Sequence, residues 1–152
     1  MVTERATGGN TAPKMRAYNL PPHRILLVDD QMDAADIAAL LLQQLGQDVL
    51  QVYDGESALE VAQEFRPEII VLDLDMPGLG GIEVAKAIRG LPPPMGDCRI
   101  IAYTGMARPE YRQAAIKAGF SDYLVKPVSL SRWIEILSTR PSPGGGPRGG
   151  DP

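Results

Sequence analysis

The chain has 152 residues, of which 44% are hydrophobic and 22% charged, proportions typical of one globular domain rather than a fibrous or wholly disordered protein. The formal net charge is -4, which disfavours a protein that binds nucleic acid directly. One cysteine and one histidine cannot form a disulfide or a structural zinc site, and the chain has neither a secretory signal nor an apolar run long enough to span a membrane. We therefore expect a cytoplasmic protein without membrane association.

Both ends of the chain differ in composition from the middle. Residues 1–22 are small and polar with no periodic apolar pattern, so we expect a disordered N-terminal arm. Nine of the fourteen residues in 139–152 are glycine or proline, and this composition predicts a disordered tail. The remaining residues, 23–138, are enough for one domain with a single buried core.

Short apolar segments and segments of helical spacing alternate five times in this domain. In chain order the predicted strands are 25–28, 49–52, 69–72, 99–102 and 123–125, and the predicted helices are 34–45, 56–65, 82–89, 109–118 and 129–137. Apolar runs without a polar alternation are typical of strands buried on both faces. Strict alternation with helices predicts a parallel sheet with right-handed crossovers and helices on both faces.

The first predicted helix has a clear apolar periodicity. Its expected core-facing residues are Ala34, Ile37, Leu40, Leu41 and Leu45. Asp33 is expected to cap the start of this helix, and Gly46 is expected to end it. Ser129 is expected to cap the last helix.

Polar side chains follow the predicted strands at the edge where such sheets bind ligands, outside the carboxyl ends of the strands. These residues are Asp29, Asp30, Asp73, Thr104 and Lys126. Three neighbouring carboxylates repel one another and favour a cation, and an incomplete set of hard oxygen ligands suits Mg²⁺. With an ammonium and a hydroxyl nearby, they form the parts of a phosphoryl-transfer site in which one carboxylate can become an aspartyl phosphate.

Four segments carry a resemblance to a known family: LLVDD (26–30), IIVLDLDMPGLGG (69–81), IIAYTG (100–105) and DYLVKP (122–127). In order and spacing they resemble the response-regulator receiver domains of two-component signalling, over roughly residues 23–138. The resemblance implies a flavodoxin-like, doubly wound (βα)5 fold with strand order 2-1-3-4-5. Because only the Gly/Pro-rich tail follows residue 138, we expect a stand-alone receiver without an output domain.

The resemblance also implies a role for each site residue. Asp73 is the expected phosphoacceptor, and it binds Mg²⁺ together with the carboxylate of Asp30 and the backbone carbonyl of Asp75. Asp29 assists through water or hydrogen bonds. Lys126 contacts Asp73 or a phosphoryl oxygen, and the Lys126–Pro127 peptide bond is expected to be cis.

Two further residues are expected to transmit the signal. Thr104 follows the phosphoryl group, and Tyr123 is the aromatic residue whose rotamer reports activation. The phosphoryl group comes from a phosphohistidine of a histidine kinase or histidine phosphotransfer protein. The chain then catalyses only its own phosphorylation and dephosphorylation, and a downstream protein recognises the surface formed by residues 108–117, the last strand and residues 129–137.

Two features depart from the usual pattern of the family. Many receivers have a neutral side chain where this chain has Asp75, and the added charge could change the lifetime of the phosphoryl group. The segment from Leu91 to Gly96 is longer than a usual connection between a helix and a strand, and we expect it on the edge opposite the site.

Two other functions fit parts of the pattern. The DxD formed by Asp73 and Asp75 resembles that of haloacid-dehalogenase-like phosphatases, but that family has its DxD on the first strand. A pseudo-receiver that acts only as an interaction module would usually lack an acidic residue, the hydroxyl or the lysine, and this chain retains them all.

Overall fold

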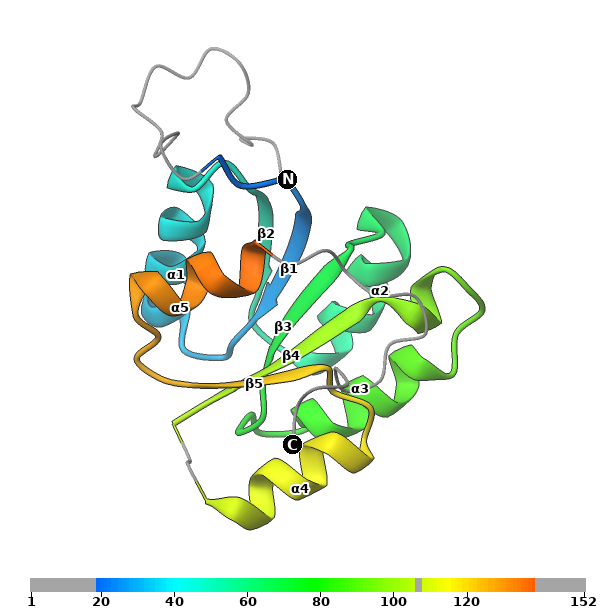
Figure 1. Ribbon diagram of the computed structural model, residues 1–152. Coiled ribbons are helices and arrows are strands. Elements are labelled where there is room, and N and C mark those ends of the chain that lie inside the picture. Colours follow the sequence, from blue (N-terminus) through cyan, green and yellow to red (C-terminus); the bar gives the residue numbers. More distant parts are fainter. Residues whose placement is uncertain (1–18, 106–107, 139–152) are drawn as a thin grey trace.

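The computed structural model describes residues 19–105 and 108–138, and within them five strands alternate with five α-helices (Figure 1). The strands are β1 (Arg24–Val28), β2 (Asp48–Val52), β3 (Ile69–Asp73), β4 (Arg99–Thr104) and β5 (Asp122–Val125). The α-helices are α1 (Met32–Gln44), α2 (Gly55–Phe65), α3 (Gly81–Arg89), α4 (Pro109–Lys117) and α5 (Leu130–Leu137), and a 3-10 helix, η3 (Met95–Asp97), precedes β4. The predicted tail and the predicted arm up to residue 18 lie outside the described residues.

The five strands form one parallel sheet in the order β2-β1-β3-β4-β5, which confirms the expected flavodoxin-like fold. The strand order reverses between β1 and β3, because β2 lies on the outer side of β1. Val28 pairs with Leu72 across this junction, so the residues that follow, Asp29 and Asp73, lie side by side at the carboxyl edge. This edge is where open α/β sheets bind their ligands.

Helices cover both faces of the sheet, and each face has its own core. Successive residues of the central strands point to opposite faces, so Leu26, Leu72 and Ile100 pack under α2, α3 and α4. Ile25 and Val71, with their neighbours on β4, pack under α1 and α5 on the other face. Burial on both faces explains the continuous apolar runs, as the sequence predicted.

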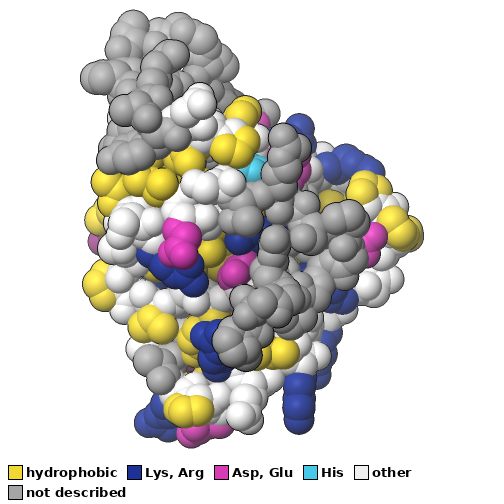
Figure 2. Space-filling model, viewed as in Figure 1, with side chains coloured by type: hydrophobic (Ala, Val, Ile, Leu, Met, Phe, Trp, Pro, Cys, Tyr) yellow, Lys and Arg dark blue, Asp and Glu magenta, His cyan; other side chains and the backbone are white. Residues whose placement is uncertain are grey.

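The prediction for the buried face of α1 was wrong in part: Leu45 is buried and Leu41 packs against the core, but Ile37 and Leu40 are exposed. The residues of α1 that pack against the sheet are Ala35, Ala38, Ala39 and Leu42, and Leu45 follows them. Ile37 is 70% exposed and Leu40 is 57% exposed, and hydrophobic side chains reach the surface on the side of the molecule where α1 lies (Figure 2). Two apolar stripes run along this helix, and the alanine stripe faces inward because small side chains let the helix approach the branched residues of the sheet.

The ends of α1 also differ in part from expectation. Gln31 occupies the N-cap position without a side-chain hydrogen bond, so Asp33 is not the cap but lies in the first turn. A carboxylate there is still favourable, because it faces the positive end of the helix dipole. Gly46 ends the helix with φ of 88°, as predicted, since glycine adopts this left-handed conformation without a steric cost.

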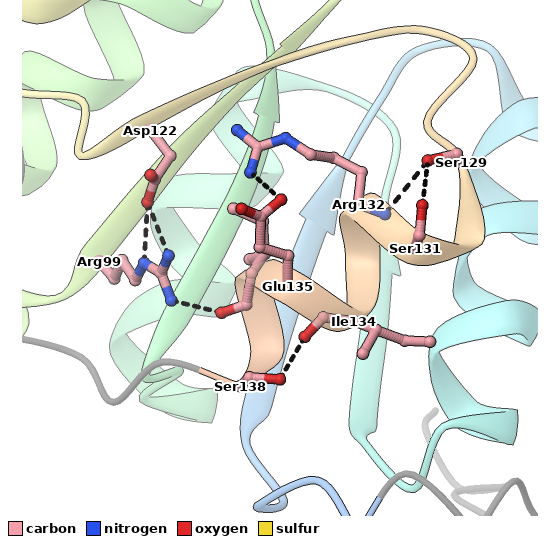
Figure 3. Close-up of polar contacts among 9 residues, drawn as sticks. Arg99, Asp122, Ser129, Ser131, Arg132, Ile134, Glu135 and Ser138 are labelled. Atoms are coloured by element: carbon pink, nitrogen blue, oxygen red, sulfur yellow. Dashed lines mark hydrogen bonds and ion pairs between the residues drawn. The ribbon is translucent and has the colours of Figure 1, made fainter. Parts of the chain in front are cut away.

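Arg99 of β4 fixes the position of α5, as Figure 3 shows. Its side chain is buried, and its Nε and Nη2 atoms donate to Oδ2 of Asp122 at 3.0 and 2.8 Å. Its Nη1 atom donates to the carbonyl of Ile136 near the end of α5, at 2.8 Å. At the start of the helix, Ser129 Oγ accepts from the backbone N–H of Arg132 at 3.1 Å, which confirms the predicted cap.

Arg89, at the end of α3, organises the long connection that begins at Leu91. Its Nη1 atom donates to the carbonyl of Gly96 at 3.0 Å and also to the carbonyl of Cys98. Its Nε and Nη2 atoms donate to the carbonyl of Gly119 at 2.9 and 2.6 Å. The connection lies at the amino end of β4, away from the carboxyl edge of the sheet, as the sequence predicted.

Candidate functional site

Three carboxylates from two strand ends meet at the junction of β1 and β3. Asp29, Asp30 and Asp73 each offer an oxygen atom, and these atoms all lie within 4.8 Å of one another. Asp29 is fully buried and Asp73 is 3% exposed, whereas Asp30 is only partly buried. The three carboxylates predicted to meet at the strand ends therefore do lie side by side in the fold.

Lys126 reaches the same group from the end of β5. Its Nζ atom lies 2.9 Å from Oδ2 of Asp29 and 3.4 Å from Oδ2 of Asp73. The sequence suggested a contact with Asp73, and the shorter contact is with Asp29. The Lys126–Pro127 bond is cis, as expected, and the Lys126 backbone N–H donates to the carbonyl of Thr104 at 2.8 Å.

The surroundings of Lys126 favour its charged form. Burial on its own lowers the pKa of Lys126, but the hydrogen bond to Asp29 and the negative charge of Asp73 outweigh it, and the pKa is raised. The ammonium therefore stays charged across the physiological range. One ammonium beside three carboxylates leaves an uncompensated negative charge.

Tight turns hold the two central carboxylates in place. The backbone N–H of Gln31 donates to Oδ1 of Asp29 at 2.9 Å, and the backbone N–H of Asp75 donates to Oδ1 of Asp73 at 3.0 Å. These are Asx turns, in which the aspartate side chain bonds the backbone two residues later. The side chain of Asp75 itself is exposed.

Gly81 allows α3 to begin against the end of β3. A Cβ atom at this position would collide with the backbone carbonyl of Asp73 and with the Cα atom of Leu74. Any other residue would therefore push α3 away from the strand end, and the turn that presents Asp73 would have to move.

The ionisation of Asp73 depends strongly on its surroundings in the site. Burial raises its pKa from 3.8 to about 6, although the Asp75 N–H and the charge of Lys126 lower it, and Asp29 raises it further. At neutral pH most Asp73 side chains are ionised, at a cost to the folded state. A cation or another source of positive potential at this position would relieve that cost.

This shift predicts a pH dependence for the metal-free protein. Since the folded-state pKa of Asp73 is raised, the protonated Asp73 side chain favours the folded state. This contribution to the unfolding free energy is fully present below pH 3.8 and is lost as the pH rises through about 6. The Asp73→Asn variant cannot titrate there, so its advantage in unfolding free energy should grow with pH, to at most about 3 kcal/mol. Urea denaturation of both proteins in a chelator, between pH 4 and pH 7.5, measures this difference. A difference that does not change with pH would contradict the buried, unfavourable charge.

The donor set fits a hard divalent cation. Within residues 19–105 and 108–138, Asp29, Asp30 and Asp73 are the one group of three or more ligating side chains close enough to hold a metal ion. All the donors are carboxylate oxygens, and a few carboxylates with open positions suit Mg²⁺, which retains several of its waters. The negative charge that Lys126 leaves uncompensated favours such an ion.

The two residues expected to transmit the signal lie on neighbouring strands. Thr104 ends β4 and is buried, while Tyr123 lies on β5 and is partly buried. The guanidinium of Arg112 on α4 lies 5.8 Å from the centre of the Tyr123 ring. The Tyr123 side chain therefore lies on the face of the sheet that α4 covers, and it contacts that helix.

The sequence reasoning missed one residue of the site, Tyr103. The Nζ atom of Lys126 lies 4.6 Å from the centre of its ring. The available signal was an aromatic residue one position before Thr104 at the carboxyl end of a predicted strand. Because side chains alternate along a strand, Tyr103 points to the opposite face from Thr104 but lies at the same edge of the sheet.

Among the described residues, none of the helices combines the length and the hydrophobicity needed to cross a bilayer.

Comparison with known proteins gives one consistent family. Residues 25–138 match the family model of the response regulator receiver domain. Chemotaxis protein CheY of Thermotoga maritima is 32% identical over 116 residues, which cover 76% of this chain and 94% of CheY. Transcriptional regulatory protein PrrA of Mycobacterium tuberculosis is 37% identical over 111 residues, which cover 73% of this chain. The match spans only 46% of PrrA, about half of its length.

The solved structures agree with this result. Chemotaxis protein CheY4 of Vibrio cholerae superimposes with a TM-score of 0.72 at 30% sequence identity. The superposition covers 77% of this chain and 97% of CheY4. The similarity therefore extends over the whole CheY4 domain and not only over its sheet.

Proposed function

Because this chain belongs to the family of response-regulator receiver domains, which act as phosphorylatable switches, we propose that Asp73 is its phosphoacceptor. The observation that carries the proposal is the group formed by Asp73, Asp29 and Lys126 at the strand junction. Mg²⁺-dependent labelling by a small phosphoramidate or acyl-phosphate donor, with the modified residue located by mass spectrometry, tests the assignment. Labelling elsewhere in the chain would overturn it.

The reaction is a phosphoryl transfer from nitrogen to oxygen. A carboxylate oxygen of Asp73 attacks the phosphorus of a phosphohistidine, the P–N bond breaks as the P–O bond forms, and the imidazole leaves with a proton. Lys126 lies close enough to offset negative charge that develops on the phosphoryl oxygens, and Thr104 supplies a hydroxyl donor from the end of β4. Attack by water later returns Asp73 to its free form.

Asp29, Asp30 and Asp73 would hold Mg²⁺, with the backbone carbonyl of Asp75 as a further ligand. When bound, the ion supplies positive charge that offsets both the carboxylates and the phosphoryl oxygens. The arrangement of carboxylates at the β1–β3 junction supports this assignment.

Mg²⁺ should stabilise the folded protein, because it binds the native carboxylate group and not the unfolded chain. At a concentration ten times the dissociation constant, the expected gain in unfolding free energy is about 1.4 kcal/mol. Asp30→Ala should remove most of this gain, whereas Asp33→Ala, which changes an exposed carboxylate of α1, should retain it. Thermal denaturation with and without Mg²⁺ measures the effect. An equal gain in both variants would place the ion elsewhere.

Phosphorylation is proposed to reach the surface through Thr104 and Tyr123. When Thr104 moves towards the phosphoryl group, it vacates space into which Tyr123 can turn, and the surface of α4, β5 and α5 changes shape. This change requires two discrete arrangements that a partner binds with different affinity. The contact between Arg112 and Tyr123 supports a coupling between β5 and α4.

Thr104→Ala should separate phosphorylation from its consequence. The variant should still accept beryllofluoride, a mimic of the phosphoryl group, because Asp73 and Lys126 are unchanged. Its amide chemical shifts should change around Asp73 but not at Tyr123 or along α5, whereas the unaltered protein should show changes at all three places. Equal shifts along α5 in both proteins would contradict the proposed route.

The proposed phosphodonor is a histidine kinase or a histidine phosphotransfer protein, and the proposed output is binding of a downstream protein through α4, β5 and α5. Kinases of this class draw their phosphoryl group from ATP, so the encounter is proposed to occur in the cytoplasm. The chain would catalyse only its own phosphorylation and dephosphorylation. The phosphatase and pseudo-receiver alternatives are not favoured, given the receiver-family match and the DxD on the third strand.

A further inference from the structure

The ammonium of Lys126 contacts two kinds of partner. Its Nζ atom lies 2.9 Å from Asp29 and 3.4 Å from Asp73. The same nitrogen lies over the ring of Tyr103, 4.6 Å from the ring centre. Tyr103 is therefore not one of the acidic residues, but it contacts Lys126, the cation that pairs with them.

A lysine needs such a support at this place. Its side chain has a flexible four-carbon stem, and the Lys126 side chain retains 21% of its exposure, so Nζ could otherwise turn towards solvent. An ammonium is attracted to the electron-rich face of an aromatic ring, and the attraction is stronger where water is excluded. Tyr103 is only 6% exposed, so its ring offers a largely desolvated surface.

The ring itself is held firmly. Tyr103 lies in β4 between two paired strands, opposite Asp73 on β3 and Leu124 on β5. Its ring lies 6.0 Å from the ring of Trp133 on α5, tilted by 49°. Trp133 is 2% exposed, so Tyr103 packs against a buried side chain.

We propose that Tyr103 is a positioning residue, which holds Nζ of Lys126 against Asp29 and Asp73 through a cation–π contact and so increases the rate of phosphorylation at Asp73. The proposal rests on the proposed function, because phosphorylation of Asp73 is its consequence. Tyr103 acts through Lys126 and has no role of its own in the transfer. Because the attraction depends on the electrons of the ring, it can be separated from the space that the ring fills.

The experiment replaces Tyr103 by phenylalanine and then by phenylalanines with increasing fluorination, which withdraw electrons from the ring with little change in shape. Phosphorylation by a phosphoramidate donor in Mg²⁺ should stay within about twofold of the parent for Tyr103→Phe. It should then slow steadily, by about 3- to 10-fold in total for the pentafluoro ring. A flat series overturns the proposal, since a ring that only fills space would be unaffected by fluorination.

A second measurement on the metal-free protein does not depend on phosphorylation. In a double-mutant cycle of Tyr103→Leu and Lys126→Met, the effects on the unfolding equilibrium constant should be coupled by at least about threefold. Independent effects overturn the proposal. If the unaltered chain is phosphorylated and the fluorinated series is flat, only Tyr103 loses its role. If the unaltered chain is not phosphorylated at Asp73, the proposed function fails, and the cycle alone decides whether the ring holds Lys126.

Discussion

Replacing Asp73 by asparagine is expected to abolish Mg²⁺-dependent phosphorylation while leaving the protein folded. The amide has the shape of the carboxylate but lacks the charge that makes an oxygen of Asp73 nucleophilic. The variant also loses a buried charge whose pKa is raised to about 6, so we expect no loss of stability at neutral pH. Mass spectrometry after incubation with a small phosphodonor measures the labelled fraction.

The matched control is Asp33→Asn, which changes an exposed carboxylate in the first turn of α1 and should be labelled like the unaltered chain. Peptide fragmentation distinguishes Asp73 from Asp75, which follows two residues later on the exposed side of the turn. Full labelling of Asp73→Asn, or a phosphoryl group on another residue of the unaltered chain, would refute the assignment.

Asp122→Ala is expected to destabilise the protein strongly, because it breaks a buried ion pair. It leaves the guanidinium of Arg99, which is 3% exposed, without the carboxylate that accepts from two of its nitrogens. Removing one partner of a buried ion pair costs about 3–5 kcal/mol, because the remaining charge cannot recover its hydration. Urea or thermal denaturation measures the loss in unfolding free energy.

The chain provides its own comparison in the pair of Arg132 and Glu135 on the outer surface of α5. Their side chains are 41% and 70% exposed, so Arg132→Ala should cost less than about 1 kcal/mol. Replacing both buried partners, as in Arg99→Met with Asp122→Leu, should recover much of the stability that Asp122→Ala loses. Similar costs for Asp122→Ala and Arg132→Ala would show that Arg99 does not depend on its ion pair.

Much of the site could be predicted from sequence because it depends on topology alone. Residues that follow parallel strands must meet at one edge, so the order of the segments sufficed to group Asp29, Asp73 and Lys126. Which carboxylate Lys126 approaches more closely depends on side-chain geometry, and no spacing along the chain reports it. Tyr103 was missed for the same reason, since its partner Lys126 is 23 positions away and follows a different strand, β5.

The helices and strands could also be predicted from the sequence, but the buried face of α1 could not. The boundaries of the elements follow from apolar runs, glycines and caps, and they agree with the structure to within a few residues. The buried face of α1 did not follow from periodicity, because Ile37 and Leu40 compete with a stripe of alanines. Hydrophobicity favours the larger residues, but the short distance between helix and sheet favours the smaller ones, and that distance is set by the whole domain.

The ion pair of Arg99 also bears on the order in which the domain can form during synthesis. Arg99 leaves the ribosome 23 residues before Asp122 and 37 residues before Ile136, which accept all of its hydrogen bonds described above. At a synthesis rate of roughly 5–20 residues per second, Asp122 emerges about 1–5 s after Arg99, and during that time the guanidinium has no carboxylate partner. Burying the charge without that partner is unfavourable, so β4 should dock fully only after β5 and α5 have emerged, whereas β1, β2 and β3 face no such delay.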